Sequence, residues 1–365
     1  MRALVSTEDE AAIEALARAE RVEGIVSPGS DWPVAIAARV AARLGLSHPL
    51  SPEAAALAVS KLGQRARLAE AGVVQPRHVV CRAPGEGAAA FAALGGGPIV
   101  VKPADRQGQA GIGVARSAEA AEAALAVALA ASRGGACLAE ELVEGVEVTV
   151  NAFSVAGRFV PLTVTDRVTD PALAFGVALA HVWPSALPDE QVDAAVAAAA
   201  AAAAALGVTD GPTYTQLVVG RDGAPRVIEL AARLGGGHDA ELCLAAVGVD
   251  LAALAVAAAL GERVDAEALV AAPAAGGATT RFLVPTRPGR LVAVEGVETA
   301  AALPGIRRVR VYREPGAELG PLRRGADRVG AILAVGSSRA EAVERAGRAA
   351  EAVRFNTSDG RDDPA

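Results

Sequence analysis

VIELAARLGGGH, residues 227–238, decides the fold of this chain together with the strand-like stretch at 213–219. The segments 213–219 and 225–230 both have the pattern of β-strands, and Arg-Asp-Gly at 221–223 is a tight-turn sequence, so they form a hairpin. Gln216 and Glu229 face each other across that hairpin. Side-chain oxygens of this kind are the ligands that Mg²⁺ prefers. The hairpin therefore predicts a metal site at Glu229 and Gln216.

The residues after the second strand extend this polar site. Arg233 follows Glu229 by four residues, which places a guanidinium where it can stabilise the oxygens of a transferring phosphoryl group. Gly235, Gly236 and Gly237 carry no side chains, so a substrate can approach their backbone closely. We expect Arg233 to be catalytic and the three glycines to shape a substrate pocket.

Lysine is rare in this chain, since Lys61 and Lys102 are the only two among its 35 basic residues. A chain that otherwise uses arginine and retains two lysines suggests a need for compact point charges. Lys102 lies near the end of an apolar strand at 99–103, before a glycine-rich loop whose backbone N–H groups suit phosphate oxygens. Lys61 lies in a helical stretch that begins near Pro52. The alternative is that both are ordinary surface lysines.

Two further segments carry candidate nucleotide contacts. The loop at 107–113 contains Gly108, Gly111 and Gly113; it is neither a Walker A loop nor a GxGxxG motif, and by itself it is typical of a plain turn. After a strand that carries a lysine, its glycines would let the backbone approach phosphates. The segment 140–147, EELVEGVE, has four acids in eight residues, for which a solvated charge run is the default interpretation. Here, however, the acids interrupt an apolar, strand-like stretch.

The ordered set of motifs from about residue 50 to about residue 240 resembles the ATP-grasp enzymes. The set is Lys61, PIVVKP with Lys102, the glycine-rich loop, EELVEGVE and VIELAARLGGGH, and its spacing agrees as well as its residues. The resemblance implies ATP, with its phosphates at Lys61, Lys102, Gly108, Gly111 and Gly113. It also implies contacts to adenine and ribose at Glu140, Glu141, Glu147 and the backbone of Val143. The metal-binding acids of the family stand 13 residues apart, as Gln216 and Glu229 do, which implies Mg²⁺, with Mn²⁺ as an alternative.

Within that family the chain resembles the L-amino-acid (dipeptide) ligases, a carboxylate–amine ligase branch. The stretches that carry this resemblance are ELAARLGGGH, LTVTDRVTD with HVWPSALP, and the arginines from Arg281 to Arg290. It implies a catalytic role for His181 near the phosphates, although a histidine in isolation is more often structural. Arg281 and Arg287 are candidates to hold a substrate carboxylate, with structural salt bridges as the alternative.

The implied reaction joins a carboxylic acid to an amine after ATP has activated the acid as an acyl phosphate, with release of ADP and phosphate. The expected substrates are small molecules, amino acids foremost. Three positions depart from the family pattern: Gln216 replaces an acid, Ala231 an asparagine, and Ala178 an acid that helps bind substrate. The first two leave open a catalytically impaired nucleotide-binding protein. A further alternative is an acyl-phosphate carboxylase of the biotin or purine-pathway type.

The expected fold is a mixed α/β ATP-grasp fold, α+β in its ATP-binding part. Residues 1–58 alternate helix and strand, with a short strand at 24–26, which predicts a truncated Rossmann-like (pre-ATP-grasp) module with an incomplete parallel sheet. We expect the ATP-grasp domain to span residues 59–275, with a lid at about 76–142. A C-terminal α+β module then covers 276–355, and the polar segment 356–365 is predicted to be a disordered tail.

Composition argues against several classes of partner. The net charge is −7 without a basic stripe or aromatic platform, so nucleic-acid binding is not expected. The longest apolar tract, at 194–206, has 13 residues, whereas a membrane span needs about 20, and no signal peptide is recognised. Cys81, Cys137 and Cys243 are far apart in sequence, which predicts buried thiols in a reducing compartment. We therefore expect a cytoplasmic protein without a membrane partner, and a homodimer is compatible with the sequence.

Overall fold

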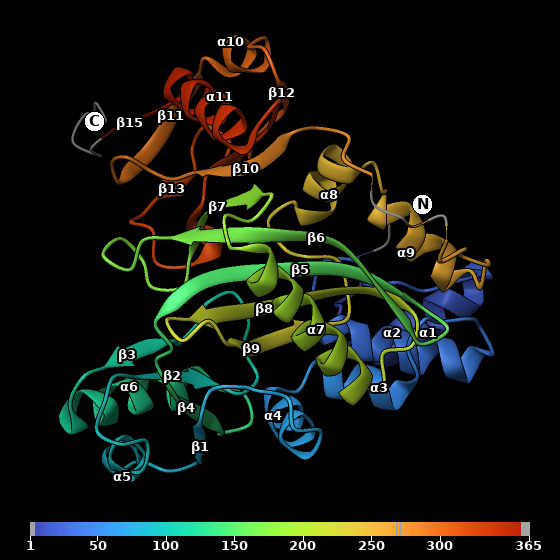
Figure 1. The fold of residues 1–365 in the computed structure, drawn as a ribbon, viewed down its shortest axis with the longest axis vertical. Coiled ribbons are helices and arrows are strands. Elements are labelled where there is room, and N and C mark those ends of the chain that lie inside the picture. The colour runs from blue at the N-terminus through green and yellow to red at the C-terminus, as the bar shows by residue number, and fades with distance from the viewer. Residues whose placement is uncertain (1–3, 268, 270–271, 359–365) are drawn as a thin grey trace.

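An eight-stranded sheet forms the centre of the fold, with a four-stranded sheet below it in the view of Figure 1 and a three-stranded sheet near the C-terminus. The computed structural model describes residues 4–267, 269 and 272–358. Every strand pairing within these residues is antiparallel. Helices and sheets are mixed along the chain, as the expected α/β class requires.

The N-terminal part of the described chain is helical. It contains α1 (Glu10–Glu20), α2 (Trp32–Leu44) and α3 (Pro52–Ala58). Asp9 caps α1 by accepting a hydrogen bond from Ala12 N, and α2 ends at Gly45 in the left-handed conformation. The predicted strand at 24–26, and with it a parallel sheet, is wrong for the described residues. Three apolar residues cannot form a ladder without a neighbouring strand, and Val26 is 39% exposed.

The four-stranded sheet has the order β1-β4-β2-β3 and its own hydrophobic core. Its strands are β1 (His78–Cys81), β2 (Ile99–Pro103), β3 (Gly113–Ala115) and β4 (Cys137–Glu141), and two helices, α5 (Glu86–Ala93) and α6 (Ala118–Ala131), pack against it. Helix α4 (Lys61–Glu70) precedes this unit in the chain. Because the unit buries its own apolar residues, it can act as a separate lobe over the central sheet.

The central sheet has the order β12-β14-β10-β7-β6-β5-β8-β9. Its strands are β5 (Gly145–Val155), β6 (Arg158–Thr169), β7 (Ala178–Trp183), β8 (Gly211–Gly220), β9 (Pro225–Ala231), β10 (Gly277–Leu283), β12 (Ile306–Val311) and β14 (Gly330–Gly336). Side chains alternate along each strand, so Val148, Val150 and Leu217 pack with α7 (Asp189–Ala205) on one face. The small alanines of α7 allow a close approach to the sheet, and Figure 1 shows this helix in front of it. The opposite face is polar at one end, while α8 (Asp239–Val247) and α9 (Leu251–Ala259) pack on its other end.

The C-terminal region is joined to the central sheet, because β10, β12 and β14 extend that sheet. The remaining C-terminal elements are α10 (Val297–Ala301), η1 (Gly325–Asp327), α11 (Arg339–Ala352) and a sheet of β11 (Gly289–Glu295), β13 (Glu318–Leu319) and β15 (Arg354–Ser358). Residues 356–358, predicted to begin a disordered tail, instead pair with β11. Local polarity does not reveal such a backbone partner. The rest of the predicted tail, 359–365, lies outside the described residues.

No single helix among the described residues has both the length and the apolar composition to cross a bilayer. The pair α8 and α9 meets those criteria only jointly, and a bend of 113° separates the two helices. Cys81, Cys137 and Cys243 are buried and unpaired, as predicted. Burial raises the pKa of the Cys137 thiol to about 11, which keeps it protonated near neutral pH.

Candidate active site

The strand register of the central sheet gathers polar side chains on one face. Gln216 on β8 lies opposite Glu229 on β9, which confirms the facing positions predicted from the hairpin. On the next strand, β5, Glu147 Oε2 accepts a hydrogen bond of 3.4 Å from Gln216 Nε2. The same face continues where Arg167 on β6 pairs in register with His181 on β7. A polar row therefore crosses five neighbouring strands.

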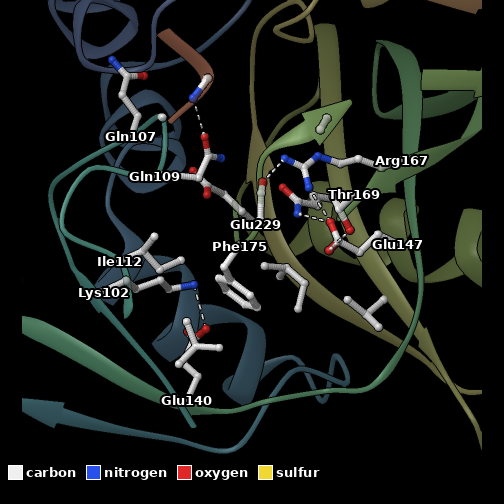
Figure 2. Close-up of a pocket in the computed structure, with 18 of the residues that line it drawn as sticks. Lys102, Gln107, Gln109, Ile112, Glu140, Glu147, Arg167, Thr169, Phe175 and Glu229 are labelled. Atoms are coloured by element: carbon white, nitrogen blue, oxygen red, sulfur yellow. Dashed lines mark hydrogen bonds and ion pairs between the residues drawn. The ribbon is translucent and has the colours of Figure 1, made fainter. Parts of the chain in front are cut away.

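This row lines a cavity of about 1380 Å³ between the central sheet and the four-stranded sheet. A volume of this size exceeds that of a typical single-ligand pocket, so a nucleotide and further substrates fit together. The sequence-predicted residues on its wall are Lys61, Lys102, Gly108, Gly113, Glu140, Glu141, Val143, Glu147, His181, Gln216, Glu229, Arg233, Gly236 and Gly237. Figure 2 shows Lys102, Glu140, Glu147 and Glu229 around this space. Gly111, Gly235 and Arg287 are not part of the wall.

Glu140 is the centre of a buried charge cluster. Its two carboxylate oxygens lie 2.8 Å from Arg65 Nε and 2.7 Å from Lys102 Nζ, and the residue is only 3% exposed. Lys102 and Glu140 share a face of the four-stranded sheet because Lys102 is paired with Leu138, two residues before Glu140. Burial works to raise the pKa of Glu140, but Lys102 and Arg65 outweigh it and hold that pKa at about 2. The carboxylate is therefore ionised and anchors both cations.

Lys61 and Glu229 form a second charged pair in the cavity. Lys61, at the first position of α4, places Nζ 3.2 Å from Glu229 Oε1 and 2.8 Å from the carbonyl oxygen of Arg106. Burial acts to raise the pKa of Glu229, but the positive charges of Lys61 and Lys102 overcome it and lower that pKa. Glu229 is thus a carboxylate that is ready to accept a cation. The two lysines lie in the cavity, so the surface-lysine alternative is wrong.

Glu141, Val143 and Glu147 occupy the path from β4 to β5. Glu141 is 2.6 Å from Arg77 Nε at the cavity edge. Val143 belongs to neither strand, which leaves its backbone available to a ligand. Glu147 lies 2.5 Å from Arg167 Nη1, inside the cavity. These acids are engaged with arginines and line a binding site, so the interpretation of 140–147 as a solvated charge run is wrong.

Arg233 is held by the N-terminal part of the chain. Its Nε lies 2.5 Å from Asp31 Oδ1, and its Nη1 donates to the carbonyl oxygen of Leu234 at 2.7 Å. Burial acts to lower the pKa of Arg233, but the negative charge of Asp31 outweighs it and raises that pKa. The guanidinium centre is 5.9 Å from the ring centroid of Tyr214. Asp31 thereby fixes the orientation of Arg233 toward the cavity.

His181 lies at the bottom of the cavity beside a buried acid. Its Nδ1 is 3.2 Å from Asp239 Oδ1, and both residues are at most 2% exposed. Phe282 packs edge-on against the imidazole, with 5.8 Å between ring centroids. Gly237 covers this pair with a left-handed φ of 80°, and a Cβ there would lie 2.7 Å from Phe282 Cζ. Only glycine fits this approach.

The other predicted glycines have different roles. A Cβ on Gly235 would lie 2.5 Å from Tyr214 Cδ2, so Gly235 packs behind the cavity wall. Gly111 likewise packs inward, since its Cβ would lie 2.6 Å from Ala131 Cβ. Gly236 has no atom within 4 Å of that position and is open to the cavity. Close packing thus explains why two of the predicted glycines do not line the site.

The structure does not bring Arg287 to the site. Arg287 is exposed in the turn between β10 and β11, and Arg281 on β10 is also exposed. A third arginine, Arg328, reaches the cavity from the segment before β14. Six residues that line or support the site were not predicted from the sequence: Asp31, Arg65, Arg167, Tyr214, Asp239 and Arg328. Two of them had a signal in the sequence, because Arg65 stands one helical turn after Lys61 and Arg167 lies within the stretch LTVTDRVTD.

The oxygen donors of the cavity fit Mg²⁺ bound mainly through one carboxylate. Glu229 supplies a carboxylate, and Gln216 can turn its amide oxygen to the same place while Nε2 donates to Glu147. Within residues 4–267, 269 and 272–358 no group of three or more His, Cys, Asp or Glu residues could hold a metal. Mg²⁺ commonly binds one or two protein carboxylates and takes its other ligands from water and phosphate. The donor set therefore suits one ion that is shared with a nucleotide.

The structural likeness to two solved proteins extends over nearly the whole chain. An L-amino acid ligase from Bacillus licheniformis superposes with a TM-score of 0.83 at 22% identity, covering 96% of this chain and 86% of that one. The biotin carboxylase domain of a 2-oxoglutarate carboxylase from Hydrogenobacter thermophilus, solved with MgADP and bicarbonate, superposes with a TM-score of 0.77 at 19% identity over 98% of this chain and 80% of that one. Both likenesses concern the fold.

Sequence comparisons add the family. An uncharacterized protein, y4rH, of Sinorhizobium fredii is 28% identical over 343 residues, which are 92% of this chain and 69% of that protein. Residues 96–241 match the family described as ATP-grasp domain, and residues 281–358 match L-amino acid ligase C-terminal domain 2. Residues 96–241 are therefore an ATP-grasp domain, and residues 281–358 are a C-terminal domain of the L-amino acid ligase type.

Proposed function

We propose that this chain joins a carboxylic acid to an amine through an acyl phosphate, with amino acids as the foremost substrates. The observation that carries the proposal is the convergence of Lys61, Lys102, Glu229 and Arg233 on one cavity from three separate segments of the chain. Two cations, one carboxylate and a positioned guanidinium are the groups that phosphoryl transfer requires. The match of residues 281–358 to an L-amino acid ligase domain supports amino acids as substrates.

The first step is activation of the acid. An oxygen of the substrate carboxylate attacks the γ-phosphorus of ATP, and the bond from that phosphorus to the β–γ bridging oxygen breaks, which releases ADP. Lys61 and Lys102 bind phosphate oxygens, and Arg233 stabilises the negative charge on the transferring group. Mg²⁺, when bound by Glu229 and Gln216, would neutralise negative charge on the phosphates.

The second step forms the amide. The amine nitrogen attacks the acyl carbon, the bond from that carbon to the phosphate oxygen breaks, phosphate leaves, and the nitrogen loses a proton. His181 is placed to take this proton, because Nδ1 faces Asp239 at 3.2 Å and Nε2 points toward the backbone of Gly237.

The loop at 107–113 protects the acyl phosphate from water in this mechanism. Gln107 Oε1 accepts from Asp31 N at 3.2 Å, and Gln109 Oε1 accepts from Gly325 N at 3.3 Å. Figure 2 shows Gln107 and Gln109 at the cavity edge opposite Arg167. These contacts draw the loop toward both the N-terminal and C-terminal regions, so it covers the cavity. Exclusion of water limits hydrolysis of the intermediate.

A second candidate is a nucleotide-binding protein that does not transfer phosphate. Gln216 and Ala231 favour it, because they remove two metal-coordinating side chains from the family pattern. Both lysines, Glu229 and Arg233 nevertheless line the cavity. The first experiment separates the two candidates.

That experiment measures ADP and phosphate release with ATP and Mg²⁺ over a panel of amino acids and small carboxylic acids, singly and in pairs. We expect release that requires one acid–amine pair, and we expect Glu229→Ala to lower kcat about 10²- to 10³-fold. Glu344→Ala is the matched control, because Glu344 on α11 is an exposed carboxylate outside the cavity, with its side chain 65% exposed.

Three outcomes are informative. Pair-dependent release that Glu344→Ala leaves intact and Glu229→Ala removes would establish the ligase. Bicarbonate-dependent release without an amine would favour the carboxylase alternative. Binding of ATP without release for every pair would favour the non-transferring protein and count against the proposal.

A further inference from the structure

Helix α4 places two buried polar side chains against the outer edge of the central sheet. β9 is the last strand in the order of that sheet, so no further strand pairs with its outer side in the described part of the chain. Gln64 binds this edge at Leu230, donating from Nε2 to the carbonyl oxygen at 2.8 Å and accepting at Oε1 from the backbone N at 3.0 Å. Arg65 donates from Nη1 to the carbonyl oxygen of Val227 at 3.1 Å and from Nη2 to that of Ile228 at 2.7 Å. Both side chains therefore satisfy backbone groups that a neighbouring strand would otherwise satisfy.

Arg65 is bound to the four-stranded sheet as well. Its Nε lies 2.8 Å from Glu140 Oε1 on β4, and the side chain of Arg65 is only 3% exposed. Its Nη1 also donates to Gln75 Oε1 at 3.1 Å, and Gln75 Nε2 donates back to the carbonyl oxygen of Arg65 at 2.8 Å. A guanidinium has five N–H donors, and these contacts together use four of them. One side chain thus joins the two sheets that enclose the cavity, beside the backbone that leads into Glu229.

Arg65 can influence a ligand only through another residue. Lys102 and Glu140 line the cavity, whereas Arg65 is not part of its wall. Glu140 connects the two cations, because Arg65 occupies Oε1 while Oε2 lies 2.7 Å from Lys102 Nζ (Figure 2). The side chain of Arg65 therefore stands behind the carboxylate, and that of Lys102 stands in front of it.

The charges in this cluster favour an anion on the cavity side. Two cations and one carboxylate leave one net positive charge, and burial keeps water from screening it fully. With Arg65 in place, Glu140 is neutralised from behind, so the charge of Lys102 remains available to an anion in the cavity. Without Arg65, Lys102 and Glu140 would form a neutral pair, and the carboxylate in the cavity wall would repel phosphate.

We propose that Arg65 is a positioning residue for phosphate binding, which holds Glu140 so that the charge of Lys102 is directed to the nucleotide. The inference rests on the nucleotide binding of the proposed function. Because Arg65 is also bound to the carbonyl oxygen of Ile228, it fixes Lys102 relative to Glu229 on the opposite sheet. Loss of Arg65 should therefore weaken binding of the phosphates and leave binding of the nucleoside intact.

The test measures the dissociation constants of ADP with Mg²⁺ and of adenosine for the full chain by isothermal titration calorimetry. The ratio of Kd for adenosine to Kd for ADP reports the phosphate contribution, because the two ligands share the nucleoside. We expect Arg65→Met to lower this ratio about 10- to 100-fold, the loss typical of a charge-assisted contact. The change should lie in Kd for ADP, with Kd for adenosine nearly unchanged.

Two controls on the same helix separate this role from a structural one. Gln64→Leu removes a residue that is likewise 3% exposed and bound to β9, but that does not contact Glu140. Arg67→Met removes an arginine whose side chain is 49% exposed and pairs with Glu70. Both variants should keep the ratio of the unmodified chain. Circular dichroism compares the folding of all variants.

Two further variants define how Arg65 acts. Arg65→Lys keeps a positive charge behind Glu140 but cannot reproduce all the bonds to β9, so its ratio should lie between those of Arg65→Met and the unmodified chain. In a Lys102→Met background, Arg65→Met should lower the ratio no further, because its effect passes through Lys102. A purely structural arginine would instead weaken ADP and adenosine equally.

The inference is overturned if Arg65→Met keeps the ratio of the unmodified chain, weakens both ligands equally, or adds its full effect to that of Lys102→Met. If Arg65→Met does not fold, Arg65→Lys decides, and an unchanged ratio in that variant overturns the inference. An unmodified chain that binds ADP no better than adenosine would instead contradict the phosphate site of the proposed function. The two failures are therefore distinguishable.

Discussion

At the scale of single residues, the cavity depends on charges that are buried in mutually compensating groups. Glu140 forms ion pairs with Arg65 and Lys102, and Glu229 forms one with Lys61. The cations around each carboxylate lower its pKa. A buried carboxyl group stays ionised only while these cations remain beside it. The same pairs that stabilise the fold therefore hold the lysines ready for phosphates.

Glu140 predicts a specific dependence of stability on pH. Its pKa of about 2 in the folded chain lies below the ordinary value of 4.5, so its contribution is present above about pH 4.5 and is lost as pH falls toward 2. We expect Glu140→Gln to lower the free energy of unfolding at pH 7 by about 3–5 kcal/mol, because Arg65 and Lys102 lose their buried partner. Urea unfolding monitored by circular dichroism between pH 7 and pH 3 would measure it, and the difference should shrink below pH 4.5.

The matched control is Glu70→Gln, which removes a carboxylate that pairs with Arg67 at the surface, where the Glu70 side chain is 62% exposed. We expect a change of less than about 1 kcal/mol at any pH. An equal effect of the two substitutions would show that the Glu140 cluster is not a significant stabilising element.

At the scale of elements, the loop at 107–113 is fixed to the four-stranded sheet through glycine. Gly111 has a left-handed φ of 73°, and a Cβ there would lie 2.6 Å from Ala131 Cβ on α6 and 2.9 Å from Pro103 Cγ on β2. Gly108 is also left-handed, but no atom lies within 4 Å of its Cβ position. The loop is therefore anchored at Gly111 and free to approach a ligand at Gly108.

Gly111→Ala should displace this anchor. We expect the substitution to cost roughly 1–3 kcal/mol more in the free energy of unfolding than Gly135→Ala, and to raise KM for ATP. Gly135 lies in the turn before β4 with a φ of 65° and nothing within 4 Å of its Cβ position, so it matches the backbone strain without the collision. Urea unfolding and steady-state kinetics measure the two effects. Identical results for both alanines would mean that strain alone, and not packing, matters at Gly111.

At the scale of the whole molecule, the cavity is built by regions that are remote in sequence. Asp31 from the N-terminal helices pairs with Arg233 after β9, 202 residues later. Gln107 contacts Asp31 from the glycine-rich loop, and Gln109 reaches Gly325 in the C-terminal region. The N-terminal helices are thus part of the site and do not merely cover the sheet.

We therefore expect Asp31→Ala to impair catalysis from a distance. Without Asp31 the Arg233 side chain is no longer oriented, and misplacement of such a group can lower kcat about 10²-fold. Asp9→Ala is the control, because it removes the α1 cap in the same region at a cost of about 1 kcal/mol in stability. Steady-state phosphate release compares the variants. Equal activity of both would contradict the role of Asp31.

Several features of this protein were predictable because they depend on neighbours in the chain. The turn at 221–223 fixes the pairing of Gln216 with Glu229, and the strand before the loop at 107–113 carries Lys102 into the cavity. The rarity of lysine singled out Lys61, the position four residues after Glu229 singled out Arg233, and the resemblance to the ATP-grasp pattern added Glu147 to the same site. These inferences use local dihedral preferences and motif spacing, which the sequence alone contains.

Other features were decided only by the tertiary structure. Asp31, Arg65 and Arg328 reach the site because distant segments pack together, and β15 forms because β11 offers an open edge. The strand expected at 24–26 fails for the converse reason, since no partner strand is described there. A charge or a backbone hydrogen bond is satisfied by whichever group packing brings near, and local sequence does not specify that partner.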